Sequence, residues 1–143
     1  MLKRDWVLLF FLLGFAVPLH AATRVDLQIE SIQIQPPEPT TVKTVTVVAS
    51  IRNNGSQAVE NGTLSVTLKK DGKKIKTIED VPVLSSLPRS GAGLSVPLSL
   101  GKLQPGDYET VVTVDPGNRI PETNENNNTA FKAFRVRDAA ASY

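Results

Sequence analysis

Short runs in which apolar and polar residues alternate recur along most of the chain, and they constrain the fold more than any other feature. A period of two puts successive side chains on opposite faces of a strand, so each run predicts a strand with one buried face. Segments rich in Pro, Gly, Asn and Asp separate the runs, and no stretch has the period of an amphipathic helix. About seven short strands with such turn signals predict an all-β, seven-stranded antiparallel Greek-key β-sandwich. The expected strands are Arg24–Gln35, Thr41–Asn53, Thr63–Lys70, Lys73–Lys76, Leu94–Leu100, Tyr108–Val114 and Phe131–Val136.

Local irregularities add detail to this prediction. The alternation of the first run shifts phase between Ile29 and Ile32, which predicts a bulge or a strand that changes sheets. Pro97 lies inside a run, so that strand is expected at a sheet edge or with a bulge. Asp71-Gly72 predicts a two-residue hairpin whose central residues both need positive φ. The segment Val81–Gly93 is expected to be irregular because it carries several Pro and Gly residues.

Two residues are expected to close the ends of the core. The pattern Leu103-x-Pro105-Gly106-x-Tyr108 matches a tyrosine corner, in which the Tyr hydroxyl bonds back to upstream backbone. Ile120 is the apolar residue of the loop Asp115–Thr129 and is expected to plug the end of the core. We expect Tyr108 and Ile120 to seal the interior at neighbouring corners.

The first residues have the parts of a secretory signal peptide: a basic start, an apolar run from Val7 to Val17, and small residues at Ala21 and Ala22. The apolar run is shorter than the roughly 20 residues that span a membrane. We therefore expect a cleavable signal peptide over residues 1–21, cut after Ala21 or Ala22, one sandwich domain over 22–138, and a flexible tail over 139–143. After cleavage, no membrane insertion is expected.

The mature composition argues against several functions. Cleavage removes the only Trp and the only His, and the chain has no Cys, so imidazole and thiol chemistry and disulfides are excluded. The remaining 14 basic and 13 acidic residues are balanced, which gives no reason to expect nucleic-acid binding. Ser99-x-x-Lys102 ends a predicted strand rather than opening a helix, so it is not read as a nucleophile motif. We predict no catalytic residue and no enzyme activity.

The loop Asp115–Thr129 carries the densest polar chemistry. Its oxygen donors suit a hard cation such as calcium, although their spacing does not match an EF-hand. The favoured interpretation is structural, because Asp and Asn side chains also bond to nearby backbone groups and order a loop from within. No cofactor is therefore expected, and calcium is the alternative. The candidate ligands are Asp115, Asn118, Glu122, Asn124 and Glu125.

This loop and several other motifs resemble the CARDB family, the cell-adhesion-related domain found in bacteria. The likeness covers roughly Arg24 to Val136, and the resemblance implies an exported sandwich that is Ig-like or fibronectin type III-like. One departure is Asn124, where an Asp is common in the family, and this weakens a metal interpretation. The residues that match the family's motifs are Asn53 and Gly55, Asp71 and Gly72, Pro105, Gly106 and Tyr108, and Asp115, Asn118, Ile120, Glu122, Asn127 and Asn128.

Three functions stay open at this point. The first is an exported, non-catalytic binding or adhesion module that engages an envelope or extracellular protein or another cell-surface component, for example by strand addition at a sheet edge. The second is a structural accessory subunit of an envelope assembly. The third is a calcium- or glycan-binding module. The sequence places the chain outside the cytoplasm, in the periplasm or beyond, and does not choose among the three.

Overall fold

The computed structural model describes residues 25–83 and 93–141, which form seven strands and one short 3-10 turn. The predicted signal peptide lies outside the described residues. The segment expected to be a tail begins with the 3-10 turn, whose Ala139 N–H donates to Thr41 Oγ1 at 3.3 Å. The elements are β1 (Leu27–Gln35), β2 (Val45–Asn53), β3 (Gly62–Lys70), β4 (Lys73–Val83), β5 (Gly93–Gly101), β6 (Gly106–Val114), β7 (Thr129–Val136) and η1 (Ala139–Ala141).

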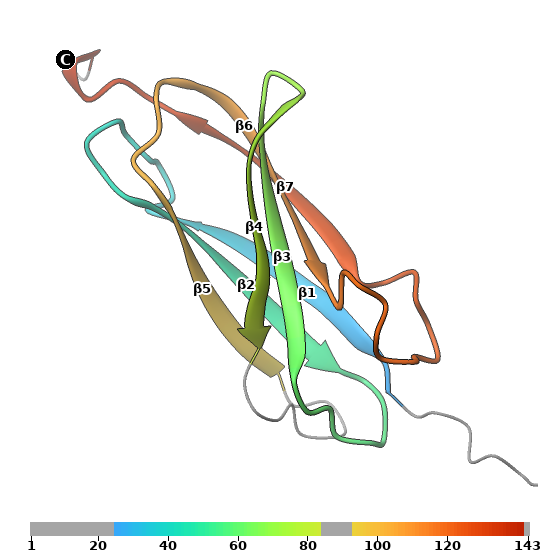
Figure 1. Cartoon of the computed structure of the whole chain (residues 1–143). Coiled ribbons are helices and arrows are strands. Elements are labelled where there is room, and N and C mark those ends of the chain that lie inside the picture. The colour runs from blue at the N-terminus through green and yellow to red at the C-terminus, as the bar shows by residue number, and fades with distance from the viewer. Residues whose placement is uncertain (1–24, 84–92, 142–143) are drawn as a thin grey trace, which may run out of the picture.

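Two sheets face each other across the core (Figure 1). One has the strand order β1-β2-β5 and the other has the order β4-β3-β6-β7, with all paired neighbours antiparallel. The chain leaves the first sheet after β2, forms the β3–β4 hairpin in the second sheet, and returns to place β5 beside β2. The predicted all-β Greek-key sandwich is confirmed.

The core is built from the inward faces of both sheets. Buried and partly exposed residues alternate along β2, β3 and β6, as the period of two requires. The fully buried large side chains come from both sheets, so the two inner faces share one interior. They are Leu27, Val45, Val47, Ile51, Leu64, Val66, Leu68, Val83, Val112, Val114 and Val136.

The local features that the sequence predicted at Ile29, Pro97 and Asp71-Gly72 are confirmed. The register of β1 against β2 shifts between Ile29 and Ser31, so a bulge restores the inward direction of Ile32. Pro97 lies in β5, an edge strand whose free side needs no backbone donor. The Asp71-Gly72 hairpin has φ angles of 49° and 76°, which are the positive values that a two-residue turn of this kind needs.

The prediction of an irregular segment from Val81 was wrong for its first three residues. Strand β4 continues through Pro82 to Val83, opposite Thr63 and Gly62 of β3. Pro82 is tolerated because β4 is an edge strand, so one side of its backbone has no partner to bond. Residues 84–92 of the predicted segment lie outside the described residues, and its last residue, Gly93, begins β5 instead of belonging to a loop.

The expectation that Tyr108 and Ile120 seal neighbouring corners was also wrong. Tyr108 lies near the start of β6 opposite Lys70, whereas Ile120 follows the far end of β6 and lies beside Gly62. Most of β6 separates them, since the stretch from Tyr108 to Val114 at about 3.3 Å per residue spans roughly 20 Å. Ile120 is partly buried against the core and Tyr108 is buried, so they close opposite ends of the sandwich.

Candidate functional site

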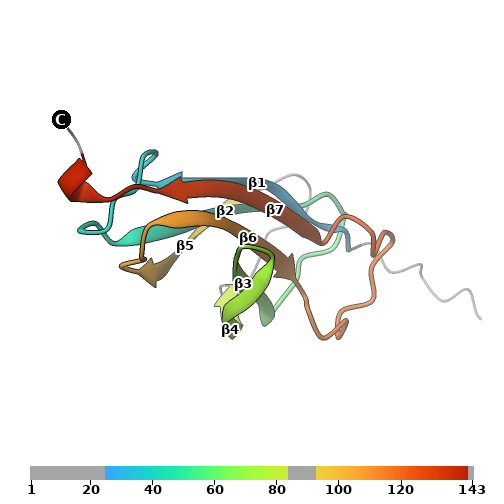
Figure 2. The ribbon, with the colours of Figure 1, turned by 90° about the horizontal axis from the view of Figure 1, so that it is seen from above.

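The seam between β1 and β7 brings together edge strands from the two different sheets. Figure 2 shows the two strands side by side along one edge of the sandwich. At one end of the seam, Thr41 N–H donates to the Arg137 carbonyl and Arg137 N–H donates to the Pro39 carbonyl, both at 3.0 Å. A parallel bridge between Thr40 and Arg137 accompanies these bonds. The sheets are therefore joined directly by backbone at this end.

At the other end, the loop of residues 115–128 clamps β1 onto the second sheet. Leu27 N–H donates to Glu122 Oε2 at 2.7 Å, and Thr123 N–H donates to the Val25 carbonyl at 2.9 Å. The Asn127 amide adds a 2.7 Å bond to Asp26 Oδ1. The loop thus holds the start of β1, some hundred positions earlier in the chain, through side chains and backbone together.

The first turn of this loop is organised by Asp115. Its two carboxylate oxygens accept from Arg119 N–H at 3.1 Å and from Ile120 N–H at 2.9 Å, while its carbonyl accepts from Asn118 N–H at 3.0 Å. Asp115 and Asn118 have φ of 48° and 49°, a region that Asp and Asn tolerate better than most residues. The buried carboxylate of Asp115 is therefore occupied by backbone donors and orients Ile120 toward the core.

Glu122, Glu125, Asn118 and Asn128 form a compact cluster behind this turn. Asn128 Nδ2 donates to Glu122 Oε1 at 2.8 Å, and Glu122 N–H donates to Glu125 Oε1 at 3.0 Å. In the orientation that satisfies both groups, the Asn118 amide donates to Glu125 Oε2 at 2.8 Å. The fifth candidate ligand, Asn124, accepts from Asn126 N–H at 3.0 Å instead. Asn118, Glu122 and Glu125, three of the five predicted cation ligands, thus gather here. The other two, Asp115 and Asn124, accept hydrogen bonds from backbone amides of their own turns.

The electrostatics of the cluster centre on Glu122. Burial raises the pKa of its carboxyl to about 6, because desolvation disfavours the charged form. The hydrogen bonds from Leu27 and Asn128 act against this rise, and the charges of Glu125 and Asp115 add to it. A cation beside Glu122 would favour its charged form and so reverse the shift.

The geometry does not form a metal site built from carboxylates alone. Across residues 25–83 and 93–141, no group of three or more His, Cys, Asp or Glu side chains is arranged to hold a metal ion. The buried Oδ1 atoms of Asn127 and Asn128, however, have no hydrogen-bond partner. Calcium is commonly coordinated by amide oxygens of this kind. A cation here would therefore be bound by amide oxygens as well as by Glu122 and Glu125.

Asn53 extends the clamp to the loop after β2. It is fully buried, and its Oδ1 accepts from Gly55 N–H at 3.0 Å and from Asp26 N–H at 3.3 Å. Its Nδ2 donates to the Gln57 carbonyl at 2.8 Å. Asn53 and Gly55 therefore act as one turn that also fixes Asp26, next to the residue held by Glu122.

The corner motif lies at the opposite end of the molecule. The Tyr108 hydroxyl donates to the Gln104 carbonyl at 2.7 Å, which is the geometry of a tyrosine corner. Its ring stacks on Phe134, with centroids 5.5 Å apart, and the Lys70 ammonium lies 5.4 Å from the ring centroid. Gly106 has φ of 151° and lies against the Lys70 side chain, where a Cβ would be 2.7 Å from Lys70 Cε. Pro105 and Gly106 therefore lead the chain tightly into β6.

Between its two joined ends, the seam opens into a groove of about 690 Å³ that our sequence reasoning did not identify. Ile32 and Ile34 of β1 form one wall, and Phe134 of β7 contributes to the other. Lys132 stands at an inward-facing position of β7, opposite Thr110, yet it is exposed. A lysine at an inward position of an amphipathic strand is the signal that could have indicated an open edge here. The remaining lining residues are Gln33, Gln35, Pro36, Pro37, Ala133 and Arg135.

The strand order and the corner geometry define a β-sandwich of the fibronectin type III-like class, with three strands facing four. A match to the CARDB family model over residues 24–132 narrows this class. The chain belongs to the CARDB family. No curated protein matches the chain in sequence.

Solved structures of similar fold include two domains that are each matched over most of their length. The CARDB domain of a Pyrococcus furiosus protein, in complex with di-metal ions, has 23% identity and a TM-score of 0.60, over 80% of this chain and 96% of that one. A domain of a Methanosarcina acetivorans protein whose name places it at the cell surface has 26% identity and a TM-score of 0.53, over 79% and 92%. Across the described residues, no helix is long and apolar enough to cross a membrane.

Proposed function

We propose that this protein is an exported, non-catalytic adhesion module that binds an extended segment of an envelope or extracellular protein in the groove between β1 and β7. The observation that carries this proposal is the groove itself, which lies between two sheet edges and is closed at both ends. An exposed edge offers a row of backbone donors and acceptors to an added strand. The CARDB fold and the cell-surface relative support an exported role.

The side chains around the groove indicate what kind of segment fits. Ile32, Ile34 and Phe134 offer apolar contacts to alternate residues of an extended chain. Lys132 has no ion-pair partner among the described residues, whereas Arg135 is paired with Asp107 at 2.7 Å. The partner segment is therefore one in which apolar residues alternate with residues that include a carboxylate. Lys132 also discourages pairing with unsuitable strands, which favours selectivity.

Selection of short random peptides against the immobilised domain tests this proposal. We expect the selected peptides to alternate apolar and acidic residues, and to shift the amide resonances of β1 and β7 in titrations followed by nuclear magnetic resonance. Lys132→Glu is expected to weaken binding about tenfold or more, because it places like charge against the carboxylate. Lys74→Glu makes the same change of charge on the distant β3–β4 hairpin and is expected to leave binding unchanged.

Two results would count against the groove. One is a set of selected peptides whose resonance shifts fall on other strands. The other is equal binding by wild type and Lys132→Glu when both variants have the same thermal midpoint. Either result removes the groove as the binding surface.

A second candidate function is calcium binding at the loop of residues 115–128. It is supported by the gathering of Glu122, Glu125 and Asn118, by the unpartnered amide oxygens of Asn127 and Asn128, and by the metal-bound CARDB domain of Pyrococcus furiosus. The cluster ranks second because its carboxylates already accept hydrogen bonds from backbone and amide groups.

Calorimetry with calcium alone distinguishes this candidate. Binding predicts heat at millimolar calcium or below, a rise in the thermal midpoint, and loss of both in Glu125→Gln. Absence of heat and of any shift of the thermal midpoint in the wild type would exclude calcium binding, and this result would not affect the proposal that the groove binds a peptide.

A further inference from the structure

The fold sorts charged side chains toward opposite ends of the sandwich, although the sequence as a whole is nearly balanced. One end carries the turn after β1, the tip of the β3–β4 hairpin, the turn before β6 and the segment after β7; we call it the basic end. In its half of the described residues, ten basic residues face five acidic ones: Lys43, Lys69, Lys70, Lys73, Lys74, Lys76, Lys102, Lys132, Arg135 and Arg137 against Glu38, Asp71, Asp107, Glu109 and Asp138.

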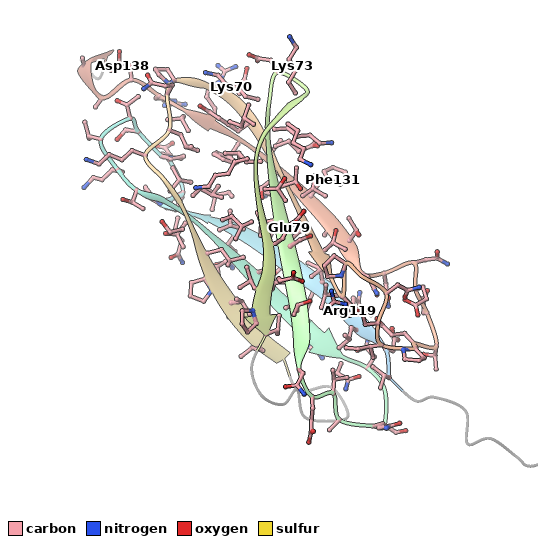
Figure 3. The ribbon with its side chains drawn as sticks, viewed as in Figure 1. Lys70, Lys73, Glu79, Arg119, Phe131 and Asp138 are labelled. Atoms are coloured by element: carbon pink, nitrogen blue, oxygen red, sulfur yellow. The ribbon has the colours of Figure 1, made fainter. Side chains whose placement is uncertain are left out.

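The other half, which carries the loop of residues 115–128, has the opposite balance; we call its tip the acidic end. Figure 3 shows Lys70 and Lys73 at the hairpin tip and Arg119 at the far end of the molecule. In this half, two basic residues face eight acidic ones: Arg52 and Arg119 against Asp26, Glu30, Glu60, Glu79, Asp80, Asp115, Glu122 and Glu125.

Most cations of the basic end have no charge partner within the described residues. Lys69 pairs with Glu109 at 3.9 Å, Lys70 lies over Tyr108, and Arg135 pairs with Asp107. Seven further basic residues are exposed and form no ion pair within residues 25–83 and 93–141; they are Lys43, Lys73, Lys74, Lys76, Lys102, Lys132 and Arg137. None of these seven is required by a charge partner inside the fold.

Apolar side chains stand among these cations. Of the three large hydrophobic residues that are strongly exposed, Val42 (59%) and Ile75 (51%) belong to the basic end, and Phe131 (72%) belongs to the side of β7. Val42 is followed by Lys43, and Ile75 lies between Lys74 and Lys76. Exposed apolar residues flanked by lysines are the pattern of a surface that meets the interface of an anionic bilayer, where the cations contact headgroups and the apolar groups contact the acyl boundary.

We propose that the basic end docks reversibly on a membrane surface that contains anionic lipid, through Lys73, Lys74, Lys102 and the exposed side chains of Ile75 and Val42. This goes beyond peptide binding, because none of these five residues lines the groove. The net negative charge of the opposite half opposes any approach with that end first, so docking orients the molecule with its acidic end away from the membrane.

Cosedimentation with vesicles tests the docking. Vesicles of phosphatidylcholine with about one third phosphatidylglycerol are compared with vesicles of phosphatidylcholine alone, at low salt and at about 0.5 M NaCl. We expect binding to the anionic vesicles only, released by salt. The double variant Lys73→Glu/Lys74→Glu is expected to lower the partition coefficient about tenfold or more, and Ile75→Ser about threefold.

Arg119→Glu is the control, because it reverses an exposed charge at the acidic end, away from the docking surface, and it is expected to change the partition coefficient by less than about twofold. Every variant carries the same residues 1–24, so differences between variants report on the basic end alone. Equal binding to both kinds of vesicle, or equal binding by wild type and the double variant, would overturn the docking. The peptide titrations with Lys132→Glu are independent of this outcome, so the two proposals fail or stand separately.

Discussion

At the acidic end of the sandwich, the carboxylates of Asp115 and Glu122 accept hydrogen bonds from backbone amides of their own chain. At the basic end, Lys73 and Lys74 are exposed and have no ion pair among the described residues. Both regions are turns rich in charged residues, and composition alone would rank them as equal candidates for binding. The difference is that one set of charges is used inside the fold and the other is not. Charge that has internal partners indicates a structural role, and charge without them indicates an external partner.

The largest effect that tests this comparison is expected for Asp115→Ala. The change removes two hydrogen bonds to a buried carboxylate and leaves the amides of Arg119 and Ile120 without their acceptor, so we expect a loss of about 3 kcal/mol in the free energy of unfolding. Asp71→Ala at the basic end is the matched control, and its strained φ of 49° predicts a cost of only about 1 kcal/mol. Urea unfolding measures both, and equal losses would contradict the distinction between the ends.

Variants of Glu122 test whether the loop holds β1 through a hydrogen-bond acceptor at this position or through its negative charge. Glu122→Ala leaves the Leu27 N–H unbonded beside a fully buried side chain, and we expect a loss of about 2 kcal/mol. Glu122→Gln keeps an oxygen for Leu27, and the Asn128 amide can turn its unpartnered Oδ1 toward the new amide, so the loss should stay below about 1 kcal/mol. Similar losses in both variants would mean that the negative charge itself holds the loop.

The tyrosine corner gives a smaller effect at the basic end. Tyr108→Phe removes the hydroxyl that donates to the Gln104 carbonyl, while the ring contacts with Phe134 and Lys70 remain. Gln104 is exposed, so water can take over its carbonyl, and we expect a loss of about 1 kcal/mol. A loss as large as that of Asp115→Ala would show that this corner, too, depends on its polar contact.

Most of the fold could be predicted because alternation reports burial directly. The bulge after Ile29 and the edge position of Pro97 both follow from local pattern, and the structure has them. The length of β4 was missed because Pro82 stands close to Pro88, Gly91 and Gly93, a cluster that is typical of a loop. A proline inside an alternating run, such as Pro97, indicates an edge strand, whereas a proline among other turn residues does not distinguish an edge strand from a loop.

The contacts at the candidate sites were missed because they join residues that are far apart in the sequence. The bonds that the loop makes to Leu27 and Asp26 join positions about one hundred residues apart, so the sequence showed the donors and not their partners. The groove depends on how far two edges from different sheets separate, which no motif encodes. The lysines of the hairpin are close in sequence, but the acidic residues opposing them run from Asp26 to Glu125, so the sorting of charge emerges only in three dimensions.

The stability of the acidic end should depend on pH because of Glu122. The pKa of Glu122 rises to about 6 in the folded protein from an ordinary value of 4.5, mainly because burial disfavours its charge. The folded state therefore holds this proton more tightly, so the contribution of Glu122 to stability is fully present below pH 4.5 and is lost as the pH rises through 6.

We therefore expect the stability of the wild type relative to Glu122→Gln to fall between about pH 4.5 and 6, by less than the effect of Tyr108→Phe because solvent reaches part of the side chain. Urea unfolding of both proteins across this range measures the difference. If calcium binds the cluster, adding it should flatten this dependence by favouring the charged carboxylate.

The smallest effect is expected for Lys73→Glu/Lys74→Glu. Both side chains are exposed at the hairpin and have no ion pair within the described residues, so the change should alter the free energy of unfolding by less than about 0.5 kcal/mol. Thermal unfolding at two salt concentrations measures it. A change above about 1 kcal/mol would mean that these lysines do serve the fold, and the contrast between charges with and without internal partners would no longer separate the two ends. An unchanged stability together with lost vesicle binding would instead assign the lysines to an external surface.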